Sequence, residues 1–199
     1  LDFAGIGTEQ VAAEVKAAFP KARVLRMDRD TVSKDGAAET KLYERFRNGE
    51  ADFLVGTKLV AKGFHFPEVT LVGVVDADTM LQMPDFRAAE RTVQLLLQAA
   101  GRAGRAEKPG EVLLQTSQPE HYAIQAVARG DYLSFAMVEL GNRRDLGYPP
   151  AAELIRLVFS GVGEAAVPRA AQGEAARLAS LAGPERLEIL GPVPAVRQR

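Results

Sequence analysis

The sequence contains no cysteine and only two histidines, His65 and His121. Without cysteine the chain can form no disulfide framework, and it offers no thiolate to a metal. Two widely separated histidines give no reason to expect a zinc site. No apolar run reaches membrane-spanning length and no signal peptide opens the chain, so we expect a cytoplasmic protein with no membrane partner. The chain begins at Leu1 rather than at methionine, and we expect a fragment of a longer protein.

An excess of charge of one sign is also lacking. The 25 lysines and arginines nearly balance the 26 aspartates and glutamates, which leaves a formal net charge of -1. No global basic field therefore attracts nucleic acid, and any nucleic-acid-binding surface must be local. The hydrophobic content of 47% is ordinary for a soluble globular protein, and 199 residues suffice for one large domain or two small ones.

Strand-like and helix-like segments alternate along most of the chain. Apolar residues at helical spacing, such as Val11, Val15 and Phe19, mark the helices, and short apolar runs mark the strands. We predict strands at residues 1–6, 23–27, 53–55, 69–75 and 111–115, with helices at residues 8–19, capped by Thr8, at 37–48, and from 84–87 through Gln98. This order predicts an α/β fold with a doubly wound, mainly parallel sheet, in which strand 69–75 is covered on both faces.

The pattern changes after residue 120. Two helices are predicted at residues 121–129 and 132–146, and Tyr148-Pro149-Pro150 then breaks the chain. We place a domain boundary there, between residues 1–147 and 148–199. The second part reads as a strand, an alanine-rich helix with Pro168 in its first turn, and another strand, at residues 154–159, 164–181 and 187–190. A unit of this size cannot close a sheet alone, so we expect a small, truncated α+β domain.

The most informative residues are Gln98, Arg102 and Arg105. If the preceding helix continues through them, their side chains line one face. Gly101 and Gly104 stand beside the arginines and allow a ligand or another domain to approach the backbone. Two guanidiniums and an amide on one face suit a phosphate chain. The alternative is a solvated basic helix end that complements the helix dipole, which explains the arginines but not the repeated Gly-Arg pair.

A second candidate lies at residues 58–67. Lys58 and Lys62 are four residues apart, Gly63 permits a turn, and Phe64, His65 and Phe66 add aromatic surface. Lysines beside aromatic rings fit a strand of nucleic acid. The alternative is that Phe64 and Phe66 anchor the core, which we expect for at least one of them, and that His65 is structural.

Carboxylates follow two of the predicted strands. Residues 28–31, Asp-Arg-Asp-Thr, could form part of a ligand site, because α/β proteins bind ligands where strands end, or a solvated turn whose charges pair with one another. Asp76 and Asp78 are likewise candidate site residues or ordinary strand terminators. The sequence leaves both alternatives open.

Together these motifs resemble the last signature motifs of superfamily-two helicases. Within them, the chain most resembles the PriA family, the primosomal replication-restart DNA helicases of bacteria. The resemblance covers essentially the whole chain. Its matching stretches are residues 5–9, 27–31, 55–57, 61–67, 84–91, 98–105, 148–150 and 191–195.

The resemblance implies the second RecA-like helicase lobe, followed by part of the C-terminal domain. In that family ATP binds with Mg²⁺ between two lobes, and Arg102 and Arg105 hold the positions of the arginine fingers. Carried over in the same way, the nucleotide-binding residues are Gln98, Gly63 and His65. The residues that couple the nucleotide to DNA are Thr57, Lys58 and Lys62, although Lys58 stands where the family commonly has glutamine.

The resemblance further implies a 3'-5' DNA helicase that recognises stalled replication forks and starts primosome assembly. Its partners would be branched and single-stranded DNA, other primosome proteins and single-stranded DNA-binding protein. This chain has no Gly-x-x-x-x-Gly-Lys-Thr/Ser loop and none of the zinc-binding cysteines of typical members, so alone it should neither hydrolyse ATP nor bind zinc. The alternative is a DNA- and protein-binding scaffold without a working ATPase, and the sequence that precedes Leu1 would discriminate the two.

Overall fold

The computed structural model describes residues 7–28, 37–57, 66, 68–101, 110–162, 165–181 and 187–194. The chain divides into two compact units, Leu1–Ala152 and Glu153–Arg199. Each unit is described by itself, and the predicted strand at residues 1–6 lies outside the described residues.

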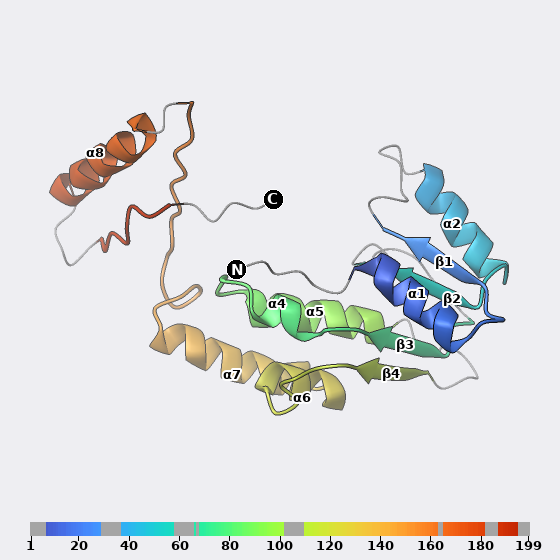
Figure 1. The fold of residues 1–199 in the computed structure, drawn as a ribbon. Helices are drawn as coiled ribbons and strands as arrows, with labels where there is room; N and C mark the ends of the chain where they lie inside the picture. The colour runs from blue at the N-terminus through green and yellow to red at the C-terminus, as the bar shows by residue number, and fades with distance from the viewer. Residues whose placement is uncertain are drawn as a thin grey trace. The chain divides into compact units, whose positions relative to one another are not determined.

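The first unit begins with two helices on a pair of parallel strands (Figure 1). Helix α1 spans Thr8–Ala18, strand β1 Val24–Met27, helix α2 Ala37–Arg47 and strand β2 Phe53–Gly56. The strands pair in register from Val24 opposite Phe53 to Met27 opposite Gly56, and α1 contacts both while α2 contacts β1. The prediction of Thr8 as the helix cap is wrong. Gly7 caps α1, and the Thr8 hydroxyl instead donates a hydrogen bond to Asp28 Oδ2 at 2.5 Å.

A second parallel pair consists of β3 and β4, which span Leu71–Val74 and Glu111–Leu114. They pair from Leu71 opposite Glu111 to Val74 opposite Leu114. The predicted α/β class with parallel strands is thereby confirmed, but the described strands form two sheets of two strands each. Among the described residues one face of β3 is open, so the expected cover of both faces stays a prediction. Leu71 is 51% exposed and Leu113 on β4 is 54% exposed, because no described element packs over that face.

The core lies between β3 and four helices. These are α4 Asp78–Leu81, α5 Ala88–Ala100, α6 Tyr122–Arg129 and α7 Tyr132–Asp145, so the two helices predicted after residue 120 are confirmed. Helix α5 contacts β3, α4, α6 and α7. Its apolar residues recur at helical spacing and therefore share one buried face. The buried cluster comprises Ala77, Val93, Leu96, Ala123, Ile124, Ala126, Val127 and Phe135.

Helix α6 begins after His121, whose Nδ1 accepts a hydrogen bond from the Ala123 backbone N–H at 3.2 Å. Burial lowers the pKa of His121 from its ordinary value of 6.5, while the nearby Asp78 and Glu139 act in the opposite direction. Below about pH 6.5 the unfolded chain therefore protonates His121 more readily than the folded chain does. The free energy of unfolding accordingly rises with pH as His121 loses its proton in the unfolded chain. The contribution of the buried, neutral His121 to stability is complete above about pH 6.5 and is lost as the pH falls below it.

We predict that the free energy of unfolding declines as the pH falls below about 6.5, and that His121→Asn removes this component of the decline. Asparagine caps a helix without titrating, so the variant should keep α6 intact above and below about pH 6.5. Denaturant unfolding of wild type and variant across this range measures the difference. Equal pH dependence in the two proteins would show that His121 does not titrate on unfolding.

The second unit contains helix α8, Ala166–Leu181, with Pro168 in its first turn as predicted. The strands predicted at residues 154–159 and 187–190 are wrong, because neither segment has regular secondary structure. Alternating apolar residues form a strand only where a neighbouring strand supplies hydrogen bonds, and no described segment of this unit pairs with either one. Their apolar side chains stay accessible, and Ile155 is 82% exposed.

Candidate nucleotide and nucleic-acid site

The carboxyl ends of β1 and β2 lie side by side, because Met27 is paired with Gly56. The next residues, Asp28 and Thr57, therefore stand at the same edge of the strand pair. Thr57 is exposed there, as a residue that contacts a ligand must be. The edge thus presents a hydroxyl side chain at the position where α/β proteins bind ligands.

Asp28 serves the fold at this edge. It is 4% exposed, accepts a hydrogen bond from Thr8 on α1, and forms an ion pair with Arg26 on β1, whose Nε lies 2.9 Å away. Arg26 also lies 3.8 Å from Glu9. For Asp28, these contacts favour the internally paired turn over the ligand site. The rest of that motif, residues 29–31, lies outside the described residues.

Helix α5 carries Gln98 on its exposed face, opposite the buried Val93 and Leu96. The described part of the helix ends at Ala100, and Gly101 caps it with φ -65° and ψ -3°. An added Cβ at Gly101 would lie 3.4 Å from the Leu97 carbonyl oxygen and 3.7 Å from that of Gln98. These are ordinary contact distances, so the lobe itself does not require glycine here.

Most of the predicted site residues lie outside the described part of the chain. They are Lys58, Lys62, Gly63, His65, Arg102 and Arg105. Thr57 and Gln98 are described, on different elements, and both are exposed. The one-face arrangement of Gln98 with the two arginines therefore remains a prediction.

Phe66 is a core anchor, which confirms the expectation that at least one of the two phenylalanines packs inward. Its side chain is 5% exposed, and its ring centroid lies 5.4 Å from that of Tyr43 and 5.3 Å from that of Phe46. The aromatic contact fixes the end of the predicted DNA-binding loop against α2. Phe66 itself therefore offers no surface for base stacking.

The carboxylates after β3 are engaged within the lobe. Asp76 adopts φ 57°, and its side chain accepts hydrogen bonds from the backbone N–H and the hydroxyl of Thr79. Asp78 is 6% exposed and accepts hydrogen bonds from the Thr116 hydroxyl and from Ser117, whose N and Oγ lie 2.6 and 2.7 Å away. The Thr116 hydrogen bond lowers the pKa of Asp78. Asp78 therefore ties the start of α4 to the residues after β4, whereas Asp76 is bonded within its own turn, and both arrangements favour the structural alternative.

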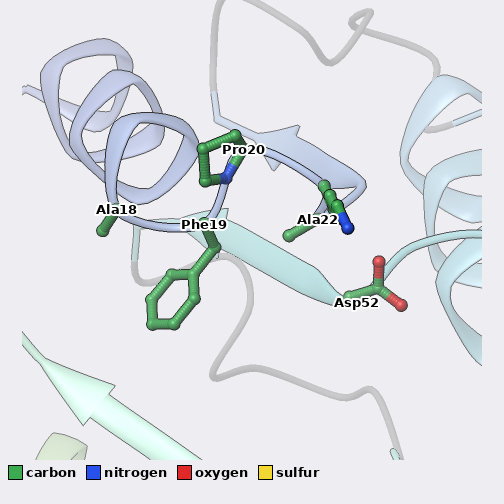
Figure 2. A pocket seen from close by; sticks show the side chains of 6 residues that line it. Ala18, Phe19, Pro20, Ala22 and Asp52 are labelled. Atoms are coloured by element: carbon green, nitrogen blue, oxygen red, sulfur yellow. The ribbon is translucent and has the colours of Figure 1, made fainter.

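A shallow hollow of about 530 Å³ lies elsewhere, at the amino ends of β1 and β2 (Figure 2). Its lining includes Phe19, Pro20 and Asp52, and the Phe19 ring stacks on Phe53 at 5.3 Å. The Arg23 guanidinium binds Asp52 at its rim and lowers the pKa of Asp52 to about 2. This hollow is at the opposite end of the strands from Thr57, so it is separate from the candidate site.

Sequence reasoning missed a network centred on Arg143. Arg143 Nη2 lies 2.7 Å from Glu90 on α5, and Arg143 Nε lies 2.8 Å from Glu139, one turn earlier on α7. Tyr122 donates a hydrogen bond to Glu139 at 2.6 Å, and burial together with this bond raises the pKa of Tyr122 to about 12. The spacing of Glu139 and Arg143 signals a helical ion pair, but the contact with Glu90 joins residues distant in sequence.

Among the described residues no group of three metal-ligating side chains gathers. In the same part of the chain, no helix is both long and apolar enough to cross a bilayer.

Comparison with known proteins identifies two matching families. Residues 8–107 match the helicase conserved C-terminal domain, and residues 144–199 match the primosomal protein N C-terminal domain. Curated relatives all named Replication restart protein PriA are similar to the chain. The Bacillus subtilis protein is 54% identical over 148 residues, which is 74% of this chain and 18% of that protein.

Other relatives match nearly the whole chain. The Synechocystis protein is 45% identical over 195 residues, which is 98% of this chain and 23% of that protein. The Rickettsia conorii protein is 37% identical over 192 residues, which is 96% of this chain and 29% of that protein. The chain therefore spans less than a third of the length of these relatives.

Proposed function

Because the chain belongs to the helicase conserved C-terminal domain family and corresponds to the C-terminal region of Replication restart protein PriA, we propose that it completes the ATPase site of a DNA helicase. In this proposal the intact protein is an ATP-dependent 3'-5' helicase that recognises stalled forks and initiates primosome assembly. The chain would supply the second RecA-like lobe. The proposal rests on the arrangement of α5. One face of this helix is packed against the core, Gln98 is exposed on another, and the helix leads directly into the Gly-Arg motif.

The proposed roles follow the chemistry of each side chain. Arg102 and Arg105 neutralise charge that develops on the γ-phosphate, while Gln98, Gly63 and His65 contact the nucleotide. Thr57, Lys58 and Lys62 bind the DNA backbone and couple it to the nucleotide. The exposure of Thr57 and Gln98 supports their assignment to a surface that faces a ligand.

ATP would bind together with Mg²⁺, which would neutralise part of the phosphate charge. The proposed residues carry guanidinium, ammonium, amide, hydroxyl and imidazole groups but no carboxylate, a set that suits phosphate oxygens better than Mg²⁺. We therefore assign the Mg²⁺ ligands and the phosphate loop to the other lobe of the intact protein. Typical family members bind zinc through cysteines, and this chain has none.

The fold and the partners are proposed on the same basis. Both strand pairs are parallel, and Leu71 and Leu113 are exposed on the face of β3 and β4 that a doubly wound sheet would cover. Residues 148–199 would be a partial domain whose exposed apolar residues pack in the intact protein. Branched and single-stranded DNA, primosome proteins and single-stranded DNA-binding protein are the proposed partners, in the cytoplasm.

Assays on the intact protein and on this chain test the proposal. The intact protein should hydrolyse ATP when forked DNA is added and should unwind duplexes with a 3' tail but not with a 5' tail. The isolated chain should show no turnover above background. DNA binding by the intact protein without ATP hydrolysis would favour the scaffold alternative and overturn the helicase assignment.

Gly101 offers a sharper check of the site. We predict that Gly101→Ala in the intact protein leaves the unfolding midpoint unchanged but lowers ATP turnover about tenfold or more, because a methyl group would stand where the nucleotide or the other lobe approaches. Gly141→Ala on α7 is the matched control, since an added Cβ there meets no atom within 4 Å. If Gly101→Ala left ATP turnover unchanged, the proposal that the nucleotide or the other lobe approaches Gly101 closely would be wrong.

A further inference from the structure

Arg143 joins two parts of the first unit that are distant in sequence, the start of α5 and the helix α7. Its guanidinium binds Glu90 in the first turn of α5 and Glu139 on α7, and it lies 5.1 Å from the centre of the Phe86 ring just before α5. The Arg143 side chain is 12% exposed and the Glu139 side chain 8%. A forked, planar cation is the side chain that can hold two carboxylates and a ring at once.

The same residues hold the segment that follows α7. Phe86 stacks on Tyr148 with ring centroids 5.1 Å apart and planes within 8°. Arg143 Nη1 donates a hydrogen bond to the Pro149 carbonyl oxygen at 3.4 Å, and the Tyr148 N–H donates to the Arg143 carbonyl oxygen at 2.7 Å. The start of α5 is thus in contact with Tyr148 and Pro149, which follow α7.

An ion pair that is partly buried adds little net stability compared with apolar packing, but the pair of Arg143 and Glu90, whose side chains are 12% and 31% exposed, restrains how α5 lies against α7. The core of α5 is already secured by Val93 and Leu96. Arg143 adds a restraint that depends on orientation, and it acts at the amino end of α5. The carboxyl end of α5 leads into the Gly-Arg motif. Small displacements of catalytic groups reduce rates strongly, so such a restraint acts on turnover more than on folding.

We propose that Arg143 is a positioning residue for ATP hydrolysis. It sets the placement of α5, and thereby of the arginine motif, through Glu90. It also links that placement to Tyr148 and Pro149. This inference rests on the proposed function, because it presumes that the motif after α5 contributes to hydrolysis.

Two variants of the intact protein test the restraint. Arg143→Lys keeps the charge but loses the fork, and Glu90→Gln releases α5 while it leaves the pair of Arg143 and Glu139 in place. Each should lower kcat for DNA-stimulated ATP hydrolysis about 10- to 100-fold with KM for ATP within about twofold of wild type. The double variant should be no slower than the slower single variant, because both changes break one link. Arg23→Lys, in the exposed pair with Asp52, is the matched control and should keep kcat unchanged.

The outcomes separate this inference from the proposed function. If the wild-type intact protein hydrolyses no ATP, the proposed function fails. If wild type is active and both variants keep a kcat within about twofold of it, only the positioning role fails. Circular dichroism melting is recorded for every variant. Loss of folding in both variants, or a double variant slowed by the product of the two single effects, would likewise overturn the positioning role.

Discussion

Replacing Arg105 by alanine in the intact protein should lower DNA-stimulated ATP turnover by about 10³- to 10⁵-fold. A guanidinium at the γ-phosphate stabilises charge that appears only in the transition state, so its loss falls on kcat rather than on nucleotide binding. Steady-state hydrolysis with saturating forked DNA measures the effect, and fluorescent nucleotide binding measures the affinity that should be retained.

Two further variants show whether the effect belongs to that position. Arg105→Lys should recover only a small part of the rate, because an ammonium cannot present two parallel donors to phosphate oxygens. Arg129→Ala, at an exposed arginine on α6, removes the same charge away from the proposed site and should leave turnover at the wild-type level. Equal rates in wild type and Arg105→Ala would mean that the finger comes from elsewhere.

The largest expected effect on stability is that of Phe135→Ala, which should lower the free energy of unfolding of the first unit by about 3–5 kcal/mol. Phe135 on α7 is 2% exposed, and its ring stacks on Tyr122 of α6 with centroids 5.7 Å apart. Truncation to alanine removes buried apolar area and leaves a cavity between the two helices. Urea denaturation of this chain, followed by far-ultraviolet circular dichroism, measures the change.

Met137→Ala is the matched control, two residues further along α7. Met137 is 76% exposed, so its truncation should change stability by less than about 0.5 kcal/mol. If the two variants unfolded at the same urea concentration, the packing of α6 against α7 through Phe135 would be disproved.

Sequence patterns predicted those parts of the fold that depend on local spacing. The helices α1 and α2 follow from apolar residues four apart, such as Val11 with Val15, and β1 to β4 follow from short apolar runs between turn residues. Their alternation also predicted that strands pair in parallel, because a helix between two strands lets the second strand run in the same direction as the first.

Features that depend on contacts across the chain could not be predicted in the same way. The Thr8 hydroxyl pairs with Asp28 instead of capping its own helix, and Glu90 meets Arg143 from a different helix. Residues 154–159 have the alternation of a strand but no described neighbour to bond with. For the candidate site, the sequence was enough to propose Gln98 and Thr57 as ligand-binding residues. The hydrogen-bond partners of Asp28 and Asp78 could be identified only from the packed structure.

The parallel pairing of β1 with β2 and of β3 with β4 also bears on how the chain reaches its native state. Each pair brings together residues that are separated by a whole helix along the chain, so the entropy of loop closure must be overcome before any ladder hydrogen bond forms. Helices α6 and α7, joined by a short turn at Gly130, face no such barrier. The helical hairpin is therefore expected to assemble first and to serve as the nucleus onto which the slower, long-range strand contacts condense.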